Sequence, residues 1–542
     1  MRWTSAIAAE RPVGRAREPA RMGRPGRGPA AWVSAALAAL GGTLLEAAFP
    51  GLSWWWAAPV AIAVLLLALR HDSIPAGLVT GATFGLTFFL LHVWWADAAV
   101  GEPIGWIALA ASQAAFVSAF GGIWVWLRRA RWLHHRRGRQ VLAVTVTWVA
   151  IERLRGRWPF GGFPWGGLAF SQTDGPLLRL APLGGTALVS VVVVMSGALM
   201  ATTLHGTGRP RRQAVLGLAA VLGVVAGVRF LPLQVTPEAG TLQIGAVQGN
   251  VPSGPLDFRS RALQVTANHA AGTSALLESA APEALDLVVW PESAADVDPR
   301  SDAVAAAIVD DAARAARAPI LLGTQRFDVR RRFNDYIVWE PGAGSLASYT
   351  KQHPVPFGEY IPYRSFFRRL TPTVDQVGTD MAAGRGTALV KVPITRLGRS
   401  VPLTTVICFE VAYDDLVRAS VLAGSEAIIV PTNNASFGRT QESTQQLAMS
   451  RFRAAEHNRA VVQISTVGVS AVIAPDGAVR RQTGLFTAEQ LIAEVPLRTS
   501  LTVADRLGSW PGLLVDLVGA VLLGGAVLDR TRRRGSRRPH DD

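Results

Sequence analysis

Long apolar stretches fill the first 232 residues of this chain, and they restrict its fold more than any other feature. A helix of about 20 apolar residues spans the hydrocarbon core of a bilayer. The stretches are residues 30–49, 52–69, 75–96, 104–127, 140–153, 178–204 and 212–232. We therefore predict a membrane domain of about seven transmembrane helices over residues 30–232, and one more transmembrane helix over residues 509–528.

Arginine-rich loops predict how these helices are oriented. The loops at residues 128–139 and 205–212 and the tail at residues 529–542 are basic, whereas residues 96–103 carry two acids and no base. Basic loops remain on the cytoplasmic side of a membrane. We therefore expect both termini in the cytoplasm. The segment between the seventh and eighth helices, which contains residues 240–500, then lies on the outer face.

Two of the predicted helices contain ionisable residues. The fifth is short and ends in Glu152 and Arg153, and the eighth contains Asp516. An ionisable residue inside a membrane helix is a candidate for function, although Glu152 paired with a neighbouring arginine is an equally good interpretation. Arg153, Arg155 and Arg157 also fall on the outer side, where the charge rule disfavours them.

The composition excludes several classes of protein. The net charge of +15 suits nucleic-acid binding, but the arginines lie beside the apolar stretches, so membrane topology explains them and we expect no nucleic-acid partner. A single cysteine among 542 residues excludes a disulfide framework and a multi-cysteine metal site. We expect no cofactor and no metal, and we interpret residues 1–29 as a disordered basic arm without function.

Residues 240–500 have a different pattern from the membrane domain. Short apolar runs such as Leu242–Val247 and Ala427–Val430 alternate with alanine-rich stretches such as Ala303–Ala316 and Gln445–Asn458. Alternation of this kind predicts an α/β domain in which helices cover a sheet.

Three chemically useful residues follow strand-like runs in this domain. Cys408, the only cysteine, ends the apolar run that begins at Val401, Glu292 follows Asp286–Pro291, and Lys351 opens a loop after a short strand. Only two of the 54 lysine and arginine residues are lysine. A lysine in this chain is therefore a stronger sign of a specific role than an arginine. Three strand ends can converge at one rim of a sheet, although most free cysteines are small buried hydrophobes.

These residue types suit acyl transfer through a thioester. A cysteine attacks as its thiolate, so its proton must be removed. Glu292 can accept that proton, and Lys351 together with the N–H of Phe409 can stabilise the oxyanion of a tetrahedral intermediate on an amide, nitrile or ester carbon. Glu359 and Glu410 remain alternatives to Glu292 as the base.

Several motifs carry a resemblance to known families. WPES at residues 290–293, YTKQHPVPFGEYIP at residues 349–362 and ICFE at residues 407–410 resemble the three signature segments of the nitrilase superfamily. Joined to a multi-span amino-terminal region and a final span, they make the chain similar to the apolipoprotein N-acyltransferase family. The resemblance implies an α/β nitrilase-like fold, a four-layer αββα sandwich, on an α-helical membrane bundle.

The resemblance also implies roles for individual residues. Glu292 corresponds to the general base, Lys351 to the oxyanion-stabilising lysine and Cys408 to the nucleophile. The supporting residues implied are Glu359, which positions the lysine, and Phe409 and Glu410, which flank the nucleophile. Phe409 stands where others have tyrosine, and Ser436 stands where many relatives carry tryptophan.

The family's reaction has two lipid substrates. By the resemblance, Cys408 takes an acyl chain from a membrane phospholipid, and the α-amino group of the amino-terminal diacylglyceryl-cysteine of an apolipoprotein then accepts it. Both substrates lie in the bilayer, so the implied location is a bacterial cytoplasmic membrane with the catalytic domain outside. The alternatives are a membrane-tethered amidase or nitrilase-type hydrolase, and a transporter or scaffold with a degenerate domain.

Two further segments combine turn-forming and apolar residues. They are residues 253–260, which include Phe258, and residues 362–381, which include Phe366 and Phe367. We expect both to face the bilayer and to act as lids that gate lipid entry. The loop at residues 156–165 is expected at the outer interface, where its tryptophans anchor the chain; lining the lipid portal is the alternative.

Overall fold

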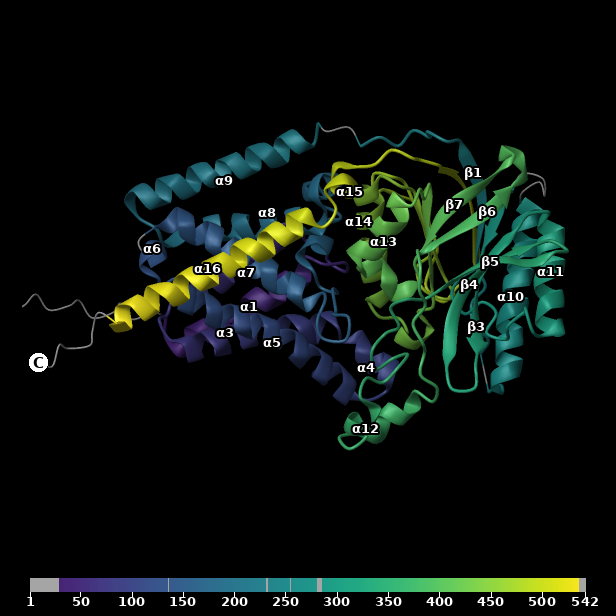
Figure 1. Cartoon of the computed structure of the whole chain (residues 1–542), viewed down its shortest axis with the longest axis horizontal. Coiled ribbons are helices and arrows are strands. Elements are labelled where there is room, and N and C mark those ends of the chain that lie inside the picture. Colours follow the sequence, from purple (N-terminus) through teal and green to yellow (C-terminus); the bar gives the residue numbers. More distant parts are fainter. Residues whose placement is uncertain (1–28, 135, 231–232, 254, 280–284, 536–542) are drawn as a thin grey trace, which may run out of the picture.

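The chain folds into a bundle of helices and an α/β part that lie side by side (Figure 1). The computed structural model describes residues 29–134, 136–230, 233–253, 255–279 and 285–535. The predicted arm at residues 1–29 lies almost wholly outside the described residues, as does much of the tail at residues 529–542.

The helical part contains a helix over each of the eight apolar stretches. Its helices are α1 (Ala31–Ala47), α2 (Ala57–Ala68), α3 (Ile74–His92), α4 (Trp95–Val100), α5 (Pro103–Leu127), α6 (Arg131–His134), α7 (Arg137–Arg155), α8 (Ala181–His205), α9 (Gly208–Val228) and α16 (Trp510–Gly535). Among the described residues, five helical segments are long and apolar enough to cross a membrane, and they involve α3, α5, α8, α9 and α16. α1 and α2 are apolar but shorter.

The ionisable residues of α7 and α16 form hydrogen bonds and ion pairs within the helical part. Arg153 donates two hydrogen bonds of 3.1 Å to Asp516 of α16, and Arg157 lies 3.5 Å from the same carboxylate. The predicted pairing of Glu152 with an arginine is wrong, because its oxygens accept hydrogen bonds from Ser190 and from the backbone of residue 168. Arg153 and Arg157 are therefore held by a carboxylate of α16, which offsets the cost of their charge near the membrane.

Two six-stranded sheets form the α/β part. The first has the order β12 (Glu489–Pro496), β1 (Thr241–Gln248), β2 (Leu287–Val289), β3 (Ile320–Phe327), β4 (Arg332–Glu340), β5 (Gly344–Thr350). The second has the order β11 (Val479–Gln482), β10 (Ala471–Ile473), β9 (Val461–Ser465), β8 (Ala427–Thr432), β7 (Arg399–Thr405), β6 (Leu389–Ile394). Each sheet has three parallel strands at its centre and antiparallel strands outside them.

The sheets pack face to face and helices cover their outer faces. α10 (Phe258–Ser279) and α11 (Ala303–Ala316) lie on the first sheet, and α13 (Asp414–Leu422) and α14 (Glu442–His457) lie on the second. A buried cluster that includes Val288, Ile320 and Val309 joins the first sheet to its helices. This αββα sandwich beside a helical bundle confirms the predicted fold class.

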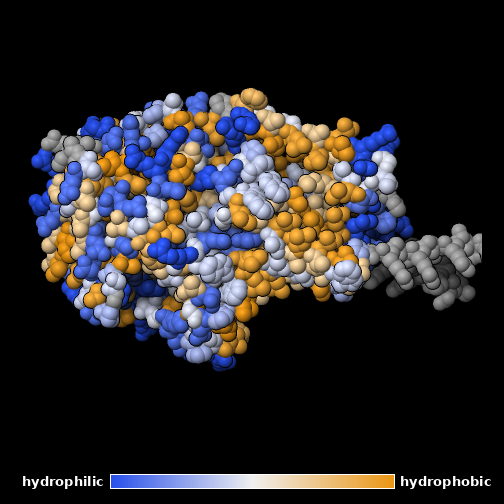
Figure 2. Space-filling model, turned by 180° about the vertical axis from the view of Figure 1, so that it is seen from behind, coloured by the Kyte–Doolittle hydropathy of each residue, from blue (hydrophilic) through white to orange (hydrophobic). Residues whose placement is uncertain are grey.

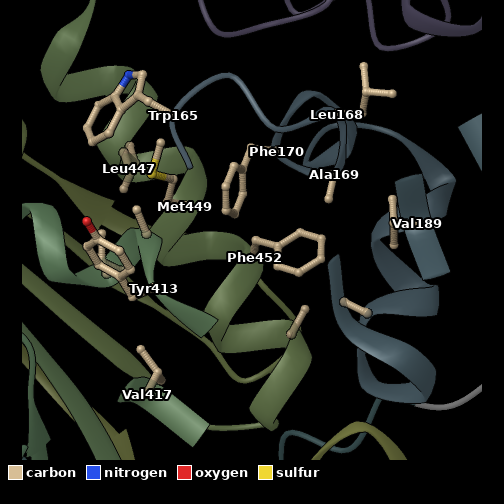
Figure 3. Close-up of a cluster of buried hydrophobic side chains, with 14 of the residues drawn as sticks. Trp165, Leu168, Ala169, Phe170, Val189, Tyr413, Val417, Leu447, Met449 and Phe452 are labelled. Atoms are coloured by element: carbon tan, nitrogen blue, oxygen red, sulfur yellow. The ribbon is translucent and has the colours of Figure 1, made fainter. Parts of the chain in front are cut away.

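The second helix layer also packs against the membrane helices, so the two parts share one core. Phe170 and Val189 of the helical part and Val417 and Phe452 of the α/β part belong to one buried apolar cluster (Figure 3). The rings of Phe170 and Phe452 lie 5.5 Å apart. The short helix α15 (Val503–Leu507) leads from this junction into α16.

The surface agrees with a membrane location for the helical part. Figure 2 shows hydrophobic residues gathered over the helices, and a hydrophilic rim at the end farthest from the α/β part. Large exposed apolar side chains such as Leu216, Leu222 and Leu517 contribute to the helical surface. An exposed apolar surface of this size is costly in water and favourable in lipid.

Candidate active site

The three predicted catalytic residues all follow strand ends, and all are buried. Glu292 comes after β2, Lys351 directly after β5 and Cys408 after β7. Their exposed fractions are 5%, 1% and 9%. Lys351 Nζ lies 3.3 Å from Glu292 Oε1, and the charges of both residues act on the Cys408 thiol. The predicted strand through Cys408 is shorter than expected, because β7 ends at Thr405.

Glu292 is held by hydrogen-bond donors on both oxygens. Its Oε1 accepts a bond of 2.6 Å from Asn334 Nδ2, and its Oε2 accepts one of 2.9 Å from the backbone N–H of Asn433. A side chain at Gly323 would lie 2.6 Å from the Cα of Glu292, so glycine is needed there. Burial raises the pKa of Glu292, against the lowering effect of Lys351. The carboxylate is therefore more basic than an exposed one.

Lys351 lies between two carboxylates. Its Nζ donates a hydrogen bond of 2.7 Å to Glu359 Oε1 in addition to the contact with Glu292, and the other oxygen of Glu359 accepts a bond of 2.7 Å from the N–H of Val355. Burial alone would lower the pKa of Lys351, but the two carboxylates raise it above its ordinary value. The lysine is therefore a fixed ammonium group in a dry site.

Cys408 occupies a strained turn. It opens the 3₁₀ helix η6 (Cys408–Ala412) with a φ of 56°, which is the left-handed region that non-glycine residues avoid. Such a conformation costs on the order of 1–3 kcal/mol and persists only where the surroundings enforce it. Burial and the Glu292 charge raise the pKa of the Cys408 thiol, while Lys351 lowers it. The resting thiol therefore needs a base to remove its proton.

Glu410 connects the turn that carries Cys408 to the loop that begins at Lys351 through hydrogen bonds. One of its oxygens accepts a bond of 2.8 Å from the N–H of Ile407. The other accepts bonds from the N–H groups of Gln352 and His353, at 2.6 and 3.0 Å, and from the Tyr349 hydroxyl at 2.9 Å. Burial raises the pKa of Glu410 to about 7. Glu410 is thus placed to orient the turn that carries the nucleophile.

Phe409 connects the nucleophile to the membrane part. Its ring stacks on Trp165, with centroids 5.7 Å apart and planes 9° apart. Trp165 belongs to the loop at residues 156–165 but is only 1% exposed. The prediction that this loop's tryptophans anchor at the interface is therefore wrong for Trp165, whereas Trp158 is 62% exposed.

Gln445 on α14 was not singled out from the sequence, yet it fixes Trp165. Its Oε1 accepts hydrogen bonds from Trp165 Nε1 at 2.6 Å and from Trp95 Nε1 at 3.0 Å. Its Nε2 donates one of 3.0 Å to the carbonyl of His92. No local pattern signals this role, because the partners lie 280 or more residues away in the chain.

Arg453 on α14 is a second residue that the sequence did not single out. It is fully buried, and it donates hydrogen bonds of 2.9 and 2.8 Å to the carbonyls of Val411 and Ala412, at the end of the nucleophile turn. Asp414 and Glu456 form ion pairs with its guanidinium. An arginine and a glutamate three residues apart in an alanine-rich stretch were the only local sign of this cluster.

The predicted lid residues are either exposed or packed on another aromatic side chain. Phe258 starts α10 and is 63% exposed, and Phe366 of α12 (Arg364–Phe367) is 55% exposed. Phe367 packs on Phe357, with ring centroids 4.8 Å apart. The loop that follows α12 touches the helical part, because Thr373 donates a hydrogen bond of 2.8 Å to a carboxylate at the start of α5.

The arrangement combines a thiol, a carboxylate of raised pKa and an ammonium group, and it offers no metal site in the part of the chain that the structure describes. No group of three or more histidine, cysteine, aspartate or glutamate residues there could hold a metal ion. A thiol, a basic carboxylate and an ammonium group together suit attack on an acyl carbon.

Comparison with known proteins identifies both parts of the chain. Residues 41–199 match the family model of the apolipoprotein N-acyltransferase N-terminal domain, and residues 243–503 match that of carbon-nitrogen hydrolases. An amidase from Nesterenkonia sp. is 17% identical, over 48% of this chain and 94% of its own, with a TM-score of 0.35.

Similarity to curated relatives extends over nearly the whole chain. The apolipoprotein N-acyltransferase of Mycolicibacterium smegmatis is 36% identical, over 95% of this chain and 89% of its own. That of Azotobacter vinelandii is 31% identical, over 91% and 95%. This chain is therefore a membrane-embedded acyltransferase that belongs to the apolipoprotein N-acyltransferase family.

Proposed function

We propose that this chain moves a fatty acyl chain from a membrane phospholipid, through a thioester on Cys408, to the α-amino group of the amino-terminal diacylglyceryl-cysteine of an apolipoprotein. One observation carries the proposal. The turn that carries Cys408 packs directly on the membrane part through Phe409 and Trp165, so the thiol lies near the junction with the helices that meet the lipid. An enzyme for small soluble amides would have no use for that contact.

The first half-reaction would form the thioester. Glu292 takes the proton of the Cys408 thiol, and the thiolate attacks the ester carbonyl of the phospholipid. The Lys351 ammonium and the N–H of Phe409 stabilise the oxyanion. Collapse of the intermediate breaks the ester C–O bond, and Glu292 returns its proton to the departing lysophospholipid hydroxyl.

The second half-reaction would form the amide. The neutral α-amino group of the lipoprotein attacks the thioester carbonyl, and Glu292 takes a proton from the nitrogen. The C–S bond then breaks, and the Cys408 thiolate recovers its proton from Glu292. Glu359 would keep Lys351 in place, and Glu410 would hold the turn, through the hydrogen bonds described above.

Lipid substrates also require access from the bilayer. Phe258, Phe366 and Phe367 would form apolar lids at the lipid surface, and the exposure of Phe258 and Phe366 supports this role. The arginine-rich loops support an orientation with both termini in the cytoplasm and the α/β part on the outer face of a bacterial cytoplasmic membrane.

The intact mass of the purified protein tests the thioester. After incubation with phospholipid alone, we expect a mass increase of one fatty acyl chain that hydroxylamine removes, and no increase in Cys408→Ala. Adding a peptide that begins with diacylglyceryl-cysteine should then transfer the chain to the peptide. An unmodified protein that instead hydrolyses small amides would replace this proposal with the hydrolase alternative.

A further inference from the structure

A hollow of about 230 Å³ lies at the opposite end of the helical part from the active site. The ends of α2, α5, α7 and α8 surround it, at the pole of the bundle where α6 lies in Figure 1. Five of its lining residues are basic, namely Arg70, Arg128, His134, Arg137 and His205. One carboxylate, that of Asp72, lines it as well.

The charges in this hollow are not balanced. Arg128 uses the single carboxylate, with a distance of 3.1 Å to Asp72 Oδ1, and it also donates to the carbonyls of Leu69 and His71. Arg137 donates to the neutral amide of Gln140 at 3.2 Å. Among the residues that the structure describes, neither Arg70 nor Arg137 has a carboxylate partner. The hollow therefore holds an excess of positive charge.

Apolar residues form the rest of the wall. Leu66, Val141, Val144, Ala198 and Ala201 line the same hollow as the arginines. The site thus has a cationic part and an apolar part, which are the two surfaces that a phospholipid presents in the headgroup region.

The retention of basic loops on one side of the membrane does not by itself explain this geometry. That rule needs arginines in a loop and sets no condition on where their side chains meet. Arg209 and Arg212 are exposed like Arg70 and Arg137, but they satisfy the rule from the start of α9, outside the hollow. Arg70 and Arg137 come from different helix ends and line one concave site.

We propose that this hollow binds the phosphate group of an anionic phospholipid in the leaflet that faces away from the α/β part. Arginine guanidinium groups bind phosphate oxygens in a planar, two-point geometry, and basic pockets between membrane helices bind anionic headgroups. The bound lipid is distinct from the acyl donor, because it occupies the other end of the bundle. Its phosphate joins the ends of α2 and α7.

Binding to the folded protein alone would stabilise the bundle by mass action. The lipid acts here as a structural ligand, so the thioester reaction at Cys408 continues without it. This separates the inference from the proposed function, and either can fail while the other holds.

Native mass spectrometry of the full chain in detergent tests the site. The probes are phosphatidylglycerol, which is anionic, and phosphatidylcholine, which is not. The test variant is Arg70→Gln with Arg137→Gln, and the matched control is Arg209→Gln with Arg212→Gln, which removes the same charge from outside the hollow. We expect the test variant to bind phosphatidylglycerol about tenfold more weakly than wild type, with the control and the phosphatidylcholine binding unchanged.

The remaining outcomes decide against the site or identify its ligand. Equal losses in both variants would mean that diffuse charge attracts the lipid, and would overturn the proposal, as would equal binding of the two lipids. Inorganic phosphate that displaces the bound lipid would show that the phosphate group alone is recognised. Melting curves of each variant without added lipid report whether it folds, and a test variant that melts like wild type but binds normally would also overturn the proposal.

Discussion

Glu292 lies beside the Lys351 ammonium group, which also binds Glu359, and the balance of these charges sets the pH at which the proposed base works. Burial and the charge of Glu359 raise its pKa, whereas Lys351 and Asn334 lower it. A base whose pKa is raised accepts protons at higher pH, so thioester formation should fall on acidification earlier than an ordinary carboxylate would predict.

The variant Glu359→Gln should move this acidic limb in a defined direction. Removal of the Glu359 charge takes away a cause that raises the pKa of Glu292, so the carboxylate should persist to lower pH. We expect the acidic limb of the thioester-formation rate to shift downward by roughly one pH unit. The rate of acyl-enzyme formation from phospholipid, followed by mass across the pH range, measures it.

The control for this experiment is Glu494→Gln, an exposed carboxylate on β12. It should leave the limb where it is in wild type. An acidic limb that moves upward in Glu359→Gln would contradict the arrangement of charges described above, and a limb that stays in place would remove Glu359 from the electrostatics of the base.

The catalytic candidates were predictable from the sequence, but their supports were not. Glu292, Lys351 and Cys408 each follow a run of strand residues, which is a local signal. Asn334 and Gln445 carry no such signal, because what defines them is a partner at a distance of 42 residues or more in the chain. The role of a hydrogen-bonding amide becomes visible only once the sheets bring its partner close.

At the scale of elements, α14 holds the nucleophile turn through one buried arginine. Replacement of Arg453 by methionine keeps an unbranched apolar stem but removes the guanidinium group, so the buried Glu456 and the carbonyls of Val411 and Ala412 lose their donor. Removal of one partner from a buried ion pair costs about 3–5 kcal/mol. We expect the melting temperature in detergent to fall by several degrees, and thioester formation to slow.

The matched control is Arg480→Gln, which removes an exposed arginine whose ion pair with Asp476 measures 3.9 Å. An exposed pair contributes about 1 kcal/mol or less, so this variant should melt close to wild type. If Arg453→Met melted like Arg480→Gln and kept its rate, Arg453 would have no positioning role.

The elements themselves were predictable to different degrees. The buried central strands, such as β2 and β8, have continuous apolar runs that identify them. The edge strand β11 has exposed polar residues, and it is defined by its pairing with β10, which the sequence does not reveal. The α11 boundaries matched the expected stretch because Asp302 caps its first turn through its side chain.

At the scale of the whole molecule, the α/β part shares its core with the membrane helices. Expressed alone, residues 236–500 would lose the ring contacts that Phe409 and Phe452 make with the helical part. Val417, Leu447 and Met449 belong to the same apolar cluster at the junction (Figure 3). An apolar patch of this kind promotes aggregation in water. We expect the isolated segment to aggregate or to bind a hydrophobic dye strongly, as measured by size-exclusion chromatography and dye fluorescence.

The full chain in detergent is the reference for that measurement. A monodisperse, soluble segment with little dye binding would show that the α/β part folds independently of the membrane helices, and that the junction is a docking surface between two separate cores.

The ion pair between Arg153 and Asp516 can form only late in synthesis of the chain. Its partners are 363 residues apart, and at about 5–20 residues per second their synthesis is separated by roughly 20–70 seconds. During that interval the Asp516 carboxylate is not available to pair with Arg153. A chain that terminates before Asp516 lacks this partner permanently, so Arg153 keeps a charge near the membrane without the carboxylate that offsets its cost in the full-length protein.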